Sequence, residues 1–353
     1  MAKKKIAVIF PKDSEAVFNI HSRRTFGGAT VQLFHLVREM SKNQEFDIYS
    51  LIPNYPVIDF PFEKDFQLIK TYQERECFLK RYFSFYKTLK NLRPEIIIQR
   101  GLTLFSCLLA VYCKIFKIKF VFMFAHDVEV KGIYQTSRKK CFLFKSLLKN
   151  SGLIVTQNTY QQNTLFERYK KETLLMPNGY PVLDAPQIEE KRGVLWVSRC
   201  DPWKKPEIFL DLAQKNPDLS FTMICPPASD KNYFNEIKRK AEEVKNLIFL
   251  DFVSFYEIDS CFHRAAVFVN TSENEGFPNT FLQAAAAGTP ILSLNVDPDG
   301  FIERNGYGVV CNGEKENLGE QLKNPDFKSV KIVYKNFNFD TGVFFKNLRE
   351  FIF

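Results

Sequence analysis

Short apolar runs alternate with amphipathic stretches along almost the whole chain, and this alternation restricts the fold more than any other feature. In the first half, six apolar runs are predicted strands: Ile6–Phe10, Asp47–Ile52, Glu95–Gln99, Phe120–Phe124, Leu153–Thr156 and Leu174–Met176. Continuous apolar runs are typical of parallel strands that are covered on both faces. The pattern therefore predicts an α/β fold with parallel sheets.

Between these runs, apolar residues recur with the helical period. The predicted helices are Ala29–Ser41, Phe78–Leu92, Leu104–Phe116, Arg138–Lys149 and Thr159–Tyr169. One helix after nearly every strand is the order of a doubly wound βα domain.

The alternation is interrupted at residues 180–192, which contain two prolines and a charge cluster and show neither period. It then restarts with predicted strands at Val194–Ser198, Phe221–Cys225, Ile248–Asp251, Ala266–Asn270 and Ile291–Leu294, and with helices at Phe209–Ala213 and Tyr233–Val244. Because a single core rarely grows past ~250–300 residues, 353 residues favour two domains. We expect Rossmann-like domains at 1–179 and 193–335, a linker at 180–192, and a terminal helix within 336–353 that Asp340 caps.

Composition predicts a cytoplasmic protein without a metal site. The eight cysteines are scattered with no Cys-x2-Cys pair, and the four histidines form no ligand motif. No apolar leader follows Met1, and the longest apolar run, Leu102–Cys113, is too short to span a bilayer.

Positive charge is concentrated in the first half of the chain. Residues 1–185 carry a net charge of +13 and residues 186–353 one of −4. Basic residues interleave with aromatic ones at 80–87, 114–119 and 138–145. An anionic membrane surface at the inner face of the membrane and a lipid pyrophosphate both suit this pattern, as do core-facing Phe residues on helices with solvated Lys faces. No nucleic-acid-binding module is recognisable, so nucleic acid is not an expected partner.

The segment from Glu275 to Gly288 predicts an anion site at the start of a helix. Glu275 lies in a loop just ahead of the helix, and Pro278 suits the first helical position. Asn279 and Gln283 are four apart and share one helix face. The N–H groups at the start of such a helix suit a phosphate. A surface loop that caps an ordinary helix would show the same sequence pattern.

Arg199 and Lys204 lie five residues apart in the loop after the strand Val194–Ser198. Two cations in a strand-to-helix loop can reach one diphosphate from two sides, and surface ion pairs are the alternative.

The first half offers two further candidates. Gly27 and Gly28 lie between the first strand and the first helix, where glycines let a backbone approach a ligand and leave N–H groups free. The alternative is that Gly27 and Gly28 only form a tight turn, which also favours glycine. His126 follows the strand Phe120–Phe124, at the sheet edge where α/β proteins bind ligands, although a lone histidine can be structural.

These segments together resemble the retaining nucleotide-sugar glycosyltransferases of family 4, which have the GT-B fold. The family pattern Glu-x7-Glu matches Glu275 and position 283, where this chain has Gln283, and Pro278 replaces the usual third Gly. Arg199 and Lys204 match its Gly-Arg-x4-Lys element, with Ser198 in place of the Gly. Further matches are Gly27-Gly28, His126, Pro177-Asn178-Gly179, Phe252-Val253-Ser254 and Asn305-Gly-Tyr-Gly308.

The resemblance implies two facing Rossmann-like domains with a cleft between them, and a terminal helix that returns to the first domain. It implies that Glu275 and His126 lie at the donor sugar. Other implied roles are diphosphate binding by Arg199, Lys204, Pro278, Asn279 and Thr280, ribose or base contact by Gln283 and Val253, and a loop at Gly27-Gly28 that faces donor and acceptor. Because Gln283 is neutral, a weaker ribose contact is implied.

The implied function is retaining, metal-independent transfer of a sugar from a nucleotide-sugar to a saccharide or lipid-linked acceptor. Uridine is the commonest nucleoside in the donors of this family, so a UDP-sugar is implied. Surface polysaccharide assembly is the commonest context, and no cofactor is implied beyond the donor. Two alternatives stay open: a non-catalytic sugar-nucleotide-binding protein, suggested by Gln283, and a GT-B phosphorylase or sugar-phosphate synthase with a small soluble acceptor.

Overall fold

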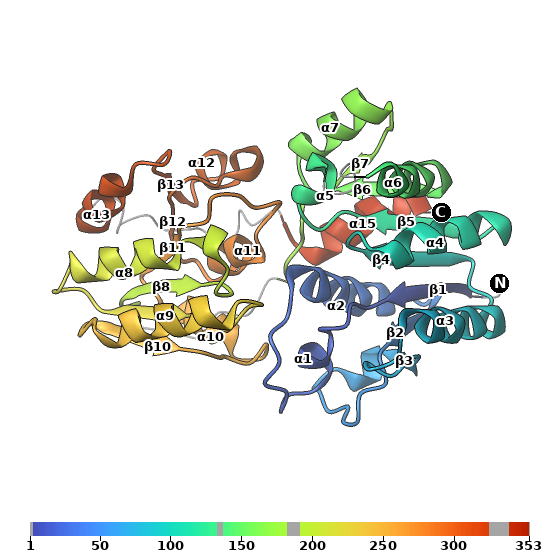
Figure 1. Ribbon diagram of the computed structural model, residues 1–353, viewed down its shortest axis with the longest axis horizontal. Coiled ribbons are helices and arrows are strands. Elements are labelled where there is room, and N and C mark those ends of the chain that lie inside the picture. The colour runs from blue at the N-terminus through green and yellow to red at the C-terminus, as the bar shows by residue number, and fades with distance from the viewer. Residues whose placement is uncertain (1–2, 133–136, 182–190, 325–338, 353) are drawn as a thin grey trace. The chain divides into compact units, whose positions relative to one another are not determined.

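The computed structural model describes residues 3–132, 137–181, 191–324 and 339–352 (Figure 1). The chain divides into two compact units, Met1–Gly179 with Phe339–Phe353, and Tyr180–Asn338. Most of the predicted linker, 182–190, lies outside the described residues, as do residues 325–338 around the predicted end of the second domain.

The first unit contains a seven-stranded parallel sheet in the order β3-β2-β1-β4-β5-β6-β7. Its strands are β1 (Lys4–Ile9), β2 (Phe46–Ile52), β3 (Gln67–Lys70), β4 (Ile96–Arg100), β5 (Lys119–Met123), β6 (Leu153–Thr156) and β7 (Leu174–Leu175). The six predicted strands are all present, and most of their apolar residues are buried, as expected for a sheet covered on both faces, with Leu153 and the edge strand β7 among the exceptions.

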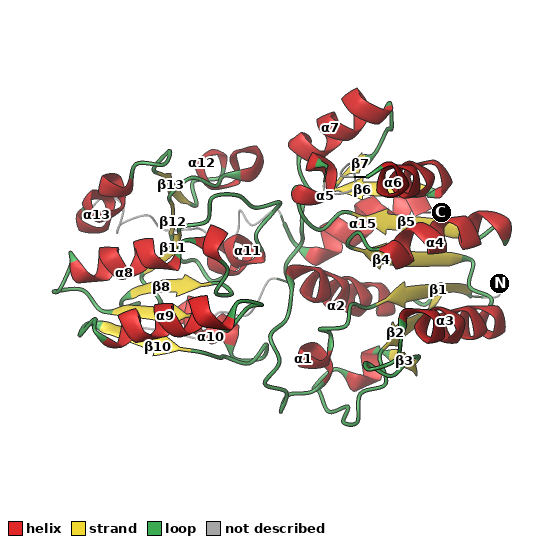
Figure 2. Ribbon diagram, viewed as in Figure 1, coloured by secondary structure: helices red, strands yellow, loops and turns green. Residues whose placement is uncertain are grey.

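Helices pack on both faces of this sheet (Figure 2). They are α1 (Glu15–Phe18), α2 (Gly28–Ser41), α3 (Phe78–Leu92), α4 (Leu104–Ile115), α5 (Val128–Lys131), α6 (Arg138–Asn150), α7 (Thr159–Tyr169) and α15 (Thr341–Ile352), with a 3-10 turn η1 (Glu63–Asp65). Thr103, Ser137 and Asn158 cap α4, α6 and α7 through their side chains, which explains why the predicted starts of these helices hold.

The second unit contains a six-stranded parallel sheet in the order β10-β9-β8-β11-β12-β13. Its strands are β8 (Val194–Val197), β9 (Phe221–Ile224), β10 (Leu247–Leu250), β11 (Val267–Asn270), β12 (Ile291–Ser293) and β13 (Gly308–Val310). The helices are α8 (Pro206–Gln214), α9 (Lys231–Glu242), α10 (Ile258–Arg264), α11 (Asn279–Ala286), α12 (Phe301–Arg304) and α13 (Lys315–Lys323), with 3-10 turns η3 (Pro202–Lys204) and η4 (Pro298–Gly300). The predicted fold class, two doubly wound βα units, is therefore confirmed.

Two strands escape the sequence pattern, and one predicted helix start is wrong. Strands β3 and β13 lie at sheet edges and are only partly buried, so neither forms an apolar run. Pro278 does not occupy the first helical position. It has extended backbone geometry (φ −65°, ψ 128°) and is the N-cap of α11, which begins at Asn279.

The terminal helix α15 belongs to the first unit. The Asp340 carboxylate accepts a hydrogen bond from the Gly342 N–H at 2.7 Å, which caps the helix. The Lys119 ammonium donates to the carbonyl groups of Phe351 and Ile352 at 2.8 and 2.9 Å. The C-terminal segment is thus fixed to the N-terminal sheet.

Each sheet reverses its strand order once, between β1 and β4 in the first unit and between β8 and β11 in the second. Loops that leave adjacent strands in opposite directions diverge at such a switch point, and α/β proteins bind ligands there. The loops after β8 and β11 are therefore the first place to look for a site in the second unit.

Among the described helices, none combines the length and the apolar composition that a membrane span requires.

Gly308 fits β13 because it has no side chain. A Cβ there would lie 1.8 Å from the Ile291 carbonyl oxygen of the neighbouring strand, and φ is +158°. We expect Gly308→Ala to lower the free energy of unfolding by about 3 kcal/mol or more, since the backbone cannot move aside without breaking the β12–β13 pairing.

Gly306→Ala is the matched control, because φ there is +66° but a Cβ would meet nothing within 4 Å. It should cost only about 1–2 kcal/mol, the price of a left-handed residue. Denaturant unfolding measures both variants, and equal losses would contradict the steric explanation.

Candidate functional site

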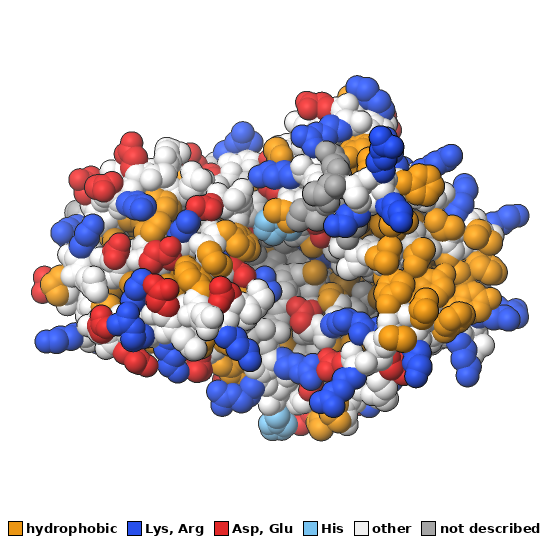
Figure 3. All heavy atoms as spheres, in the orientation of Figure 1, with side chains coloured by type: hydrophobic (Ala, Val, Ile, Leu, Met, Phe, Trp, Pro, Cys, Tyr) orange, Lys and Arg blue, Asp and Glu red, His pale blue; other side chains and the backbone are white. Residues whose placement is uncertain are grey.

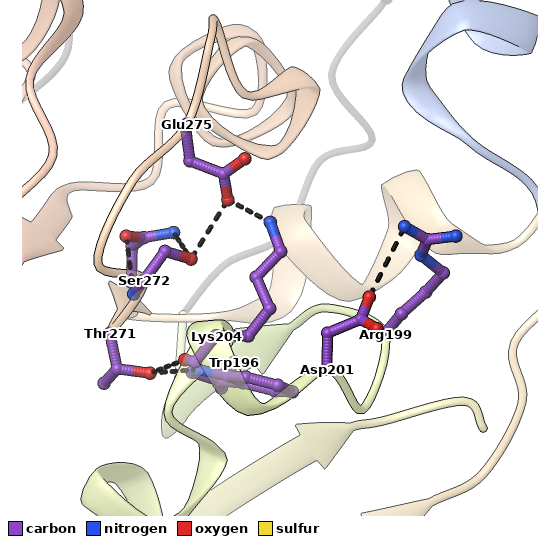
Figure 4. Close-up of polar contacts among 8 residues, drawn as sticks. Trp196, Arg199, Asp201, Lys204, Thr271, Ser272 and Glu275 are labelled. Carbon is purple, nitrogen blue, oxygen red and sulfur yellow. Dashed lines mark hydrogen bonds and ion pairs between the residues drawn. The ribbon is translucent and has the colours of Figure 1, made fainter. Parts of the chain in front are cut away.

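Two loops of the second unit meet at the switch point of its sheet (Figure 4). The loop after β8 carries Arg199 and Lys204, and the loop after β11 carries Glu275. The strands are adjacent and parallel, with Val267 opposite Val194, so both loops leave the same edge of the sheet. The fold thereby brings together residues that are 71 positions apart in the sequence.

Hydrogen bonds hold these loops together. The Thr271 hydroxyl donates to the Lys204 carbonyl oxygen at 2.7 Å and accepts from the Trp196 indole N–H at 2.9 Å. The Glu273 N–H donates to the Trp203 carbonyl oxygen at 2.9 Å. Because Thr271 and Trp196 are buried, this connection is shielded from water and fixes the backbone beneath the charged residues.

Lys204 and Glu275 form an ion pair at the centre of this arrangement. Both side chains are about nine-tenths buried, and the Ser272 hydroxyl donates to the same Glu275 oxygen at 3.0 Å. Burial lowers the pKa of Lys204, and the Glu275 carboxylate opposes that shift. Each charge is therefore held in place largely by the other.

Arg199 lies nearer to solvent on the same loop. Its guanidinium group is 3.4 Å from the Asp201 carboxylate, and its side chain is 49% exposed. Its positive charge also contributes to the lowered pKa of Lys204, so the two cations are close enough to act on one ligand. Of the two, Arg199 is the cation that a ligand from solvent can reach with less rearrangement.

Helix α11 begins at Asn279, four residues after Glu275. Its N-cap residue, Pro278, makes no capping hydrogen bond through its side chain, and Asn279 and Thr280 are half-buried in the first turn. Further along, Ala284 and Ala285 are fully buried, which lets the helix lie close against the sheet. The start of α11 thus presents helical N–H groups beside the ion pair, as an anion would need.

Gln283 lies one turn further along α11 and is buried. Its side-chain amide donates to the Asp259 carboxylate of α10 at 2.9 Å and to the Tyr180 hydroxyl at 3.3 Å. Val253 follows β10, the edge strand, and is half-buried in the loop that leads to α10.

In the first unit, the Gly27-Gly28 loop is occupied by a side chain of the protein itself. The Asp13 carboxylate accepts from the Gly27 N–H and from the Thr30 hydroxyl, both at 2.6 Å. The expectation of free N–H groups is therefore wrong for Gly27, because Asp13 caps the start of α2 in the manner of a bound anion.

His126 lies between β5 and α5, at the predicted edge of the first sheet. Its Nδ1 accepts a hydrogen bond from the Val128 N–H at 3.2 Å, so the Nδ1 position carries no proton in this arrangement. This contact orients the ring within the loop.

The Pro177-Asn178-Gly179 segment ends the first unit and is firmly attached to it. Gln32 donates to the Gly179 carbonyl oxygen at 2.7 Å and accepts from its N–H at 3.1 Å. The Asn178 side chain accepts from the buried Arg100, whose pKa is lowered to about 10 by burial.

The sequence analysis did not identify several residues of these clusters, among them Ser272, Thr271, Asp259 and Tyr180. Ser272 and Thr271 follow β11 directly and carried a positional signal, since side chains at the carboxyl end of a switch-point strand face the ligand edge. Asp259 and Tyr180 gave none, because only the fold brings them to Gln283. Within the described residues, no cluster of three or more His, Cys, Asp or Glu residues could hold a metal ion.

Comparison with known proteins identifies the family of the second unit. Residues 184–324 match the model of the family described as glycosyl transferases group 1. An uncharacterized glycosyltransferase of Haemophilus influenzae is 26% identical over 266 residues, 70% of this chain and 71% of that protein. The O-antigen biosynthesis glycosyltransferase WbnH of Escherichia coli is 28% identical over 157 residues, 43% of this chain and 44% of its own length.

Solved structures share the complete fold. A sucrose-phosphate synthase from Thermosynechococcus elongatus superposes with a TM-score of 0.76 at 17% identity, over 99% of this chain and 98% of that one. HepE of Anabaena, in complex with UDP and glucose, gives a TM-score of 0.74 at 15% identity over 99% of both chains. The family match covers Arg199, Lys204, Glu275 and Gln283, whereas Gly27, Gly28 and His126 lie outside it. The match to the glycosyl transferases group 1 model and the shared fold identify the chain as a glycosyltransferase with the GT-B fold.

Proposed function

We propose that this glycosyltransferase moves a sugar, with retention of anomeric configuration, from a UDP-sugar to a saccharide or lipid-linked saccharide acceptor. The observation that carries the proposal is the buried Lys204–Glu275 pair at the switch point of the second sheet, next to Arg199 and the start of α11. Cations and helix N–H groups can neutralise a departing nucleoside diphosphate without a metal, and no cofactor besides the donor is needed.

The choice of nucleotide and acceptor draws on the similar proteins. The solved HepE structure contains UDP and glucose, and the name of WbnH assigns that protein to O-antigen biosynthesis. The UDP in the HepE structure favours a uridine donor, and the name of WbnH favours an acceptor in surface polysaccharide or glycoconjugate assembly. Val253 would contact the base, and Gln283 the ribose.

The proposed reaction breaks the bond between the anomeric carbon and the diphosphate oxygen. The acceptor hydroxyl forms the new glycosidic bond on the same face of the sugar, and its proton leaves with the nucleoside diphosphate. Arg199, Lys204 and the α11 start at Pro278, Asn279 and Thr280 would stabilise the charge that develops on the diphosphate. Glu275 would orient the sugar, since its carboxylate is held by Lys204 and Ser272.

In the first unit, His126 and the Gly27-Gly28 loop are our candidates for contacts with the sugar substrates. Asp13 now bonds the Gly27 N–H, so an anionic acceptor group at this loop would have to displace a carboxylate. A sugar hydroxyl could instead donate to Asp13, which makes a neutral saccharide hydroxyl the better fit here.

A surface of the first unit favours contact with an anionic membrane. Helices α3, α4 and α6 expose large apolar side chains, and Figure 3 shows these gathered over the helices with Lys and Arg around them. The residues of this apolar face are Phe78, Leu79, Phe83, Leu104, Val111, Ile115, Phe116 and Phe142. Leu79, Phe83 and Ile115 are each about two-thirds exposed.

The charges on these helices have one sign. Together α3, α4 and α6 contain ten Lys and Arg residues and no Asp or Glu. A solvated helix face of an ordinary globular protein mixes both signs, so a purely basic border around exposed apolar residues suits anionic lipid. We propose that the protein binds the inner face of the membrane peripherally through this apolar face, where a lipid-linked acceptor would be presented.

The donor site can be tested with Glu275→Gln. We expect UDP at about 100 times its dissociation constant to stabilise the wild type by ~2.7 kcal/mol, and UDP-sugars to shift the melting temperature further. Glutamine can still accept from Lys204 and Ser272, so the variant should lose less stability than Lys204→Ala and still bind UDP, while sugar transfer, followed as UDP release, falls at least ~100-fold.

Parallel assays with GDP, ADP and free sugar phosphates define the limits of this proposal. Binding of GDP or ADP in place of UDP would refute the uridine donor and identify another base. Fast turnover with a free sugar phosphate as acceptor would refute the saccharide acceptor. Full activity in Glu275→Gln would refute the role of Glu275.

The two cations should separate binding from stability. Arg199→Ala removes a solvent-exposed charge, so UDP affinity should fall about tenfold while the free energy of unfolding changes by less than about 1 kcal/mol. Lys204→Ala leaves the buried Glu275 carboxylate unpaired and should cost about 3–5 kcal/mol of stability as well as UDP affinity. Calorimetric titration and denaturant unfolding measure both quantities, and an unchanged stability of Lys204→Ala would contradict the buried pair.

Membrane contact should depend on the apolar face and on lipid charge. The triple variant Leu79→Gln, Phe83→Gln, Ile115→Gln should reduce co-sedimentation with vesicles of phosphatidylglycerol and phosphatidylcholine about tenfold or more. Ile248→Gln is the matched control, since Ile248 is equally exposed but lies on the second unit. Binding that is equal on pure phosphatidylcholine, or unaffected by the triple variant, would refute this surface.

A further inference from the structure

Gln283, Tyr180 and Asp259 form a closed set of hydrogen bonds in the second unit. The Tyr180 hydroxyl donates to Asp259 Oδ1 at 2.7 Å, and Gln283 Nε2 donates to the same oxygen at 2.9 Å. Gln283 Nε2 also donates to the Tyr180 hydroxyl oxygen at 3.3 Å. Three side chains from α11, α10 and the segment ahead of the domain thus meet at one point.

The set determines how Gln283 is oriented. An ionised carboxylate can only accept hydrogen bonds, so the amide nitrogen and not the amide oxygen must face Asp259. The Tyr180 proton goes to Asp259, so the tyrosine oxygen is an acceptor for the second amide proton. Both N–H bonds of the Gln283 side chain are then used, and its Oε1 is directed elsewhere.

Burial makes this orientation costly to change. Tyr180 is 1% exposed and Gln283 is 8% exposed. Burial also raises the pKa of Tyr180, which keeps the phenol protonated and a donor. Burial raises the pKa of Asp259 too, while the hydrogen bonds from Tyr180 and Gln283 and the charge of His263 oppose that shift. In the described part of the chain, the side-chain hydrogen bonds of Gln283 run through Nε2, and none is found at Oε1.

We propose that Asp259 and Tyr180 are positioning residues that turn Gln283 into a pure hydrogen-bond acceptor for a ribose hydroxyl of the donor nucleotide. The proposal rests on the proposed function, in which Gln283 contacts the ribose. A glutamate at this position would also only accept, so the amide held by Asp259 reproduces the hydrogen bonding of an acid without a second carboxylate. The negative charge then lies on Asp259, behind the Gln283 amide, and not on residue 283 itself.

The arrangement explains why the acid is absent from position 283. A glutamate there would lie about as close to Asp259 as the present amide does, and two carboxylates at such a distance cannot both stay ionised. One would take up a proton or the pair would separate, and either change would disturb Tyr180. Glutamine at 283 and aspartate at 259 therefore form a matched pair.

The test measures recognition of the ribose hydroxyls. The probes are UDP, 2′-deoxy-UDP and 3′-deoxy-UDP, or the corresponding forms of GDP or ADP if one of those binds the wild type instead. We expect the wild type to prefer UDP over one deoxy form by about threefold to tenfold, as one neutral hydrogen bond allows. In Asp259→Ala that preference should fall to near one, while affinity for the deoxy form stays within about twofold.

A charge-swapped variant supplies the control. Gln283→Glu alone should lose the preference, and the double variant Asp259→Asn, Gln283→Glu should regain it, because the asparagine amide can donate to the new carboxylate. Asp218→Ala, at an exposed aspartate of the same unit, should change nothing. Thermal unfolding confirms that each variant is folded.

The outcomes separate this inference from the proposed function. If the wild type binds none of UDP, GDP and ADP, the proposed donor site fails and this inference with it. If the wild type binds UDP but Asp259→Ala keeps the full ribose preference, or the wild type has none, the donor site stands and the positioning role of Asp259 is refuted.

Discussion

The buried ion pair between Lys204 and Glu275 is the interaction on which the candidate site depends. Neither charge can be removed alone without leaving the other unpaired in a poorly solvated place. The pair therefore joins the loop after β8 to the loop after β11, alongside the hydrogen bonds between the two loops. The pair also limits how Lys204 could act on the proposed diphosphate. If Lys204 turned toward a diphosphate, the Glu275 carboxylate would need another positive group close by. Arg199 and the start of α11 can supply that charge.

The fold could be predicted from the sequence largely because its strands are fully buried. Continuous apolar runs marked β1, β4 and β5 clearly, and caps such as Thr103 fixed the helix starts. The pattern failed at the edge strands β3 and β13, which are half-exposed and too short to show a period, although it did identify the edge strands β7 and β10. It also failed at Pro278, because proline is equally suited to an N-cap with extended geometry and to a first helical turn.

The site was only partly readable for a different reason. Arg199, Lys204 and Glu275 lie in loops directly after strands, where chain order and sheet order together predict proximity. Asp259 and Tyr180 act on Gln283 from elements whose approach depends on how α10 and α11 pack, which no local pattern encodes. The same holds for Asp13, which takes up the Gly27 N–H that the sequence suggested would be free. Substitution of an expected acid by Gln283 looks like a loss of function in the sequence, whereas in the fold it is one half of a matched pair.

Charge is used differently in the two units. Residues 186–353 carry a net charge of −4, yet they contain the cations assigned to the donor diphosphate. A few well-placed groups suffice there, because Arg199, Lys204 and a helix start act at short range, where geometry outweighs net charge. The excess of +13 in residues 1–185 is therefore not required by the donor. Because α3, α4 and α6 hold ten of those cations around exposed Phe and Leu side chains, the proposed contact with an anionic lipid surface would account for part of the excess.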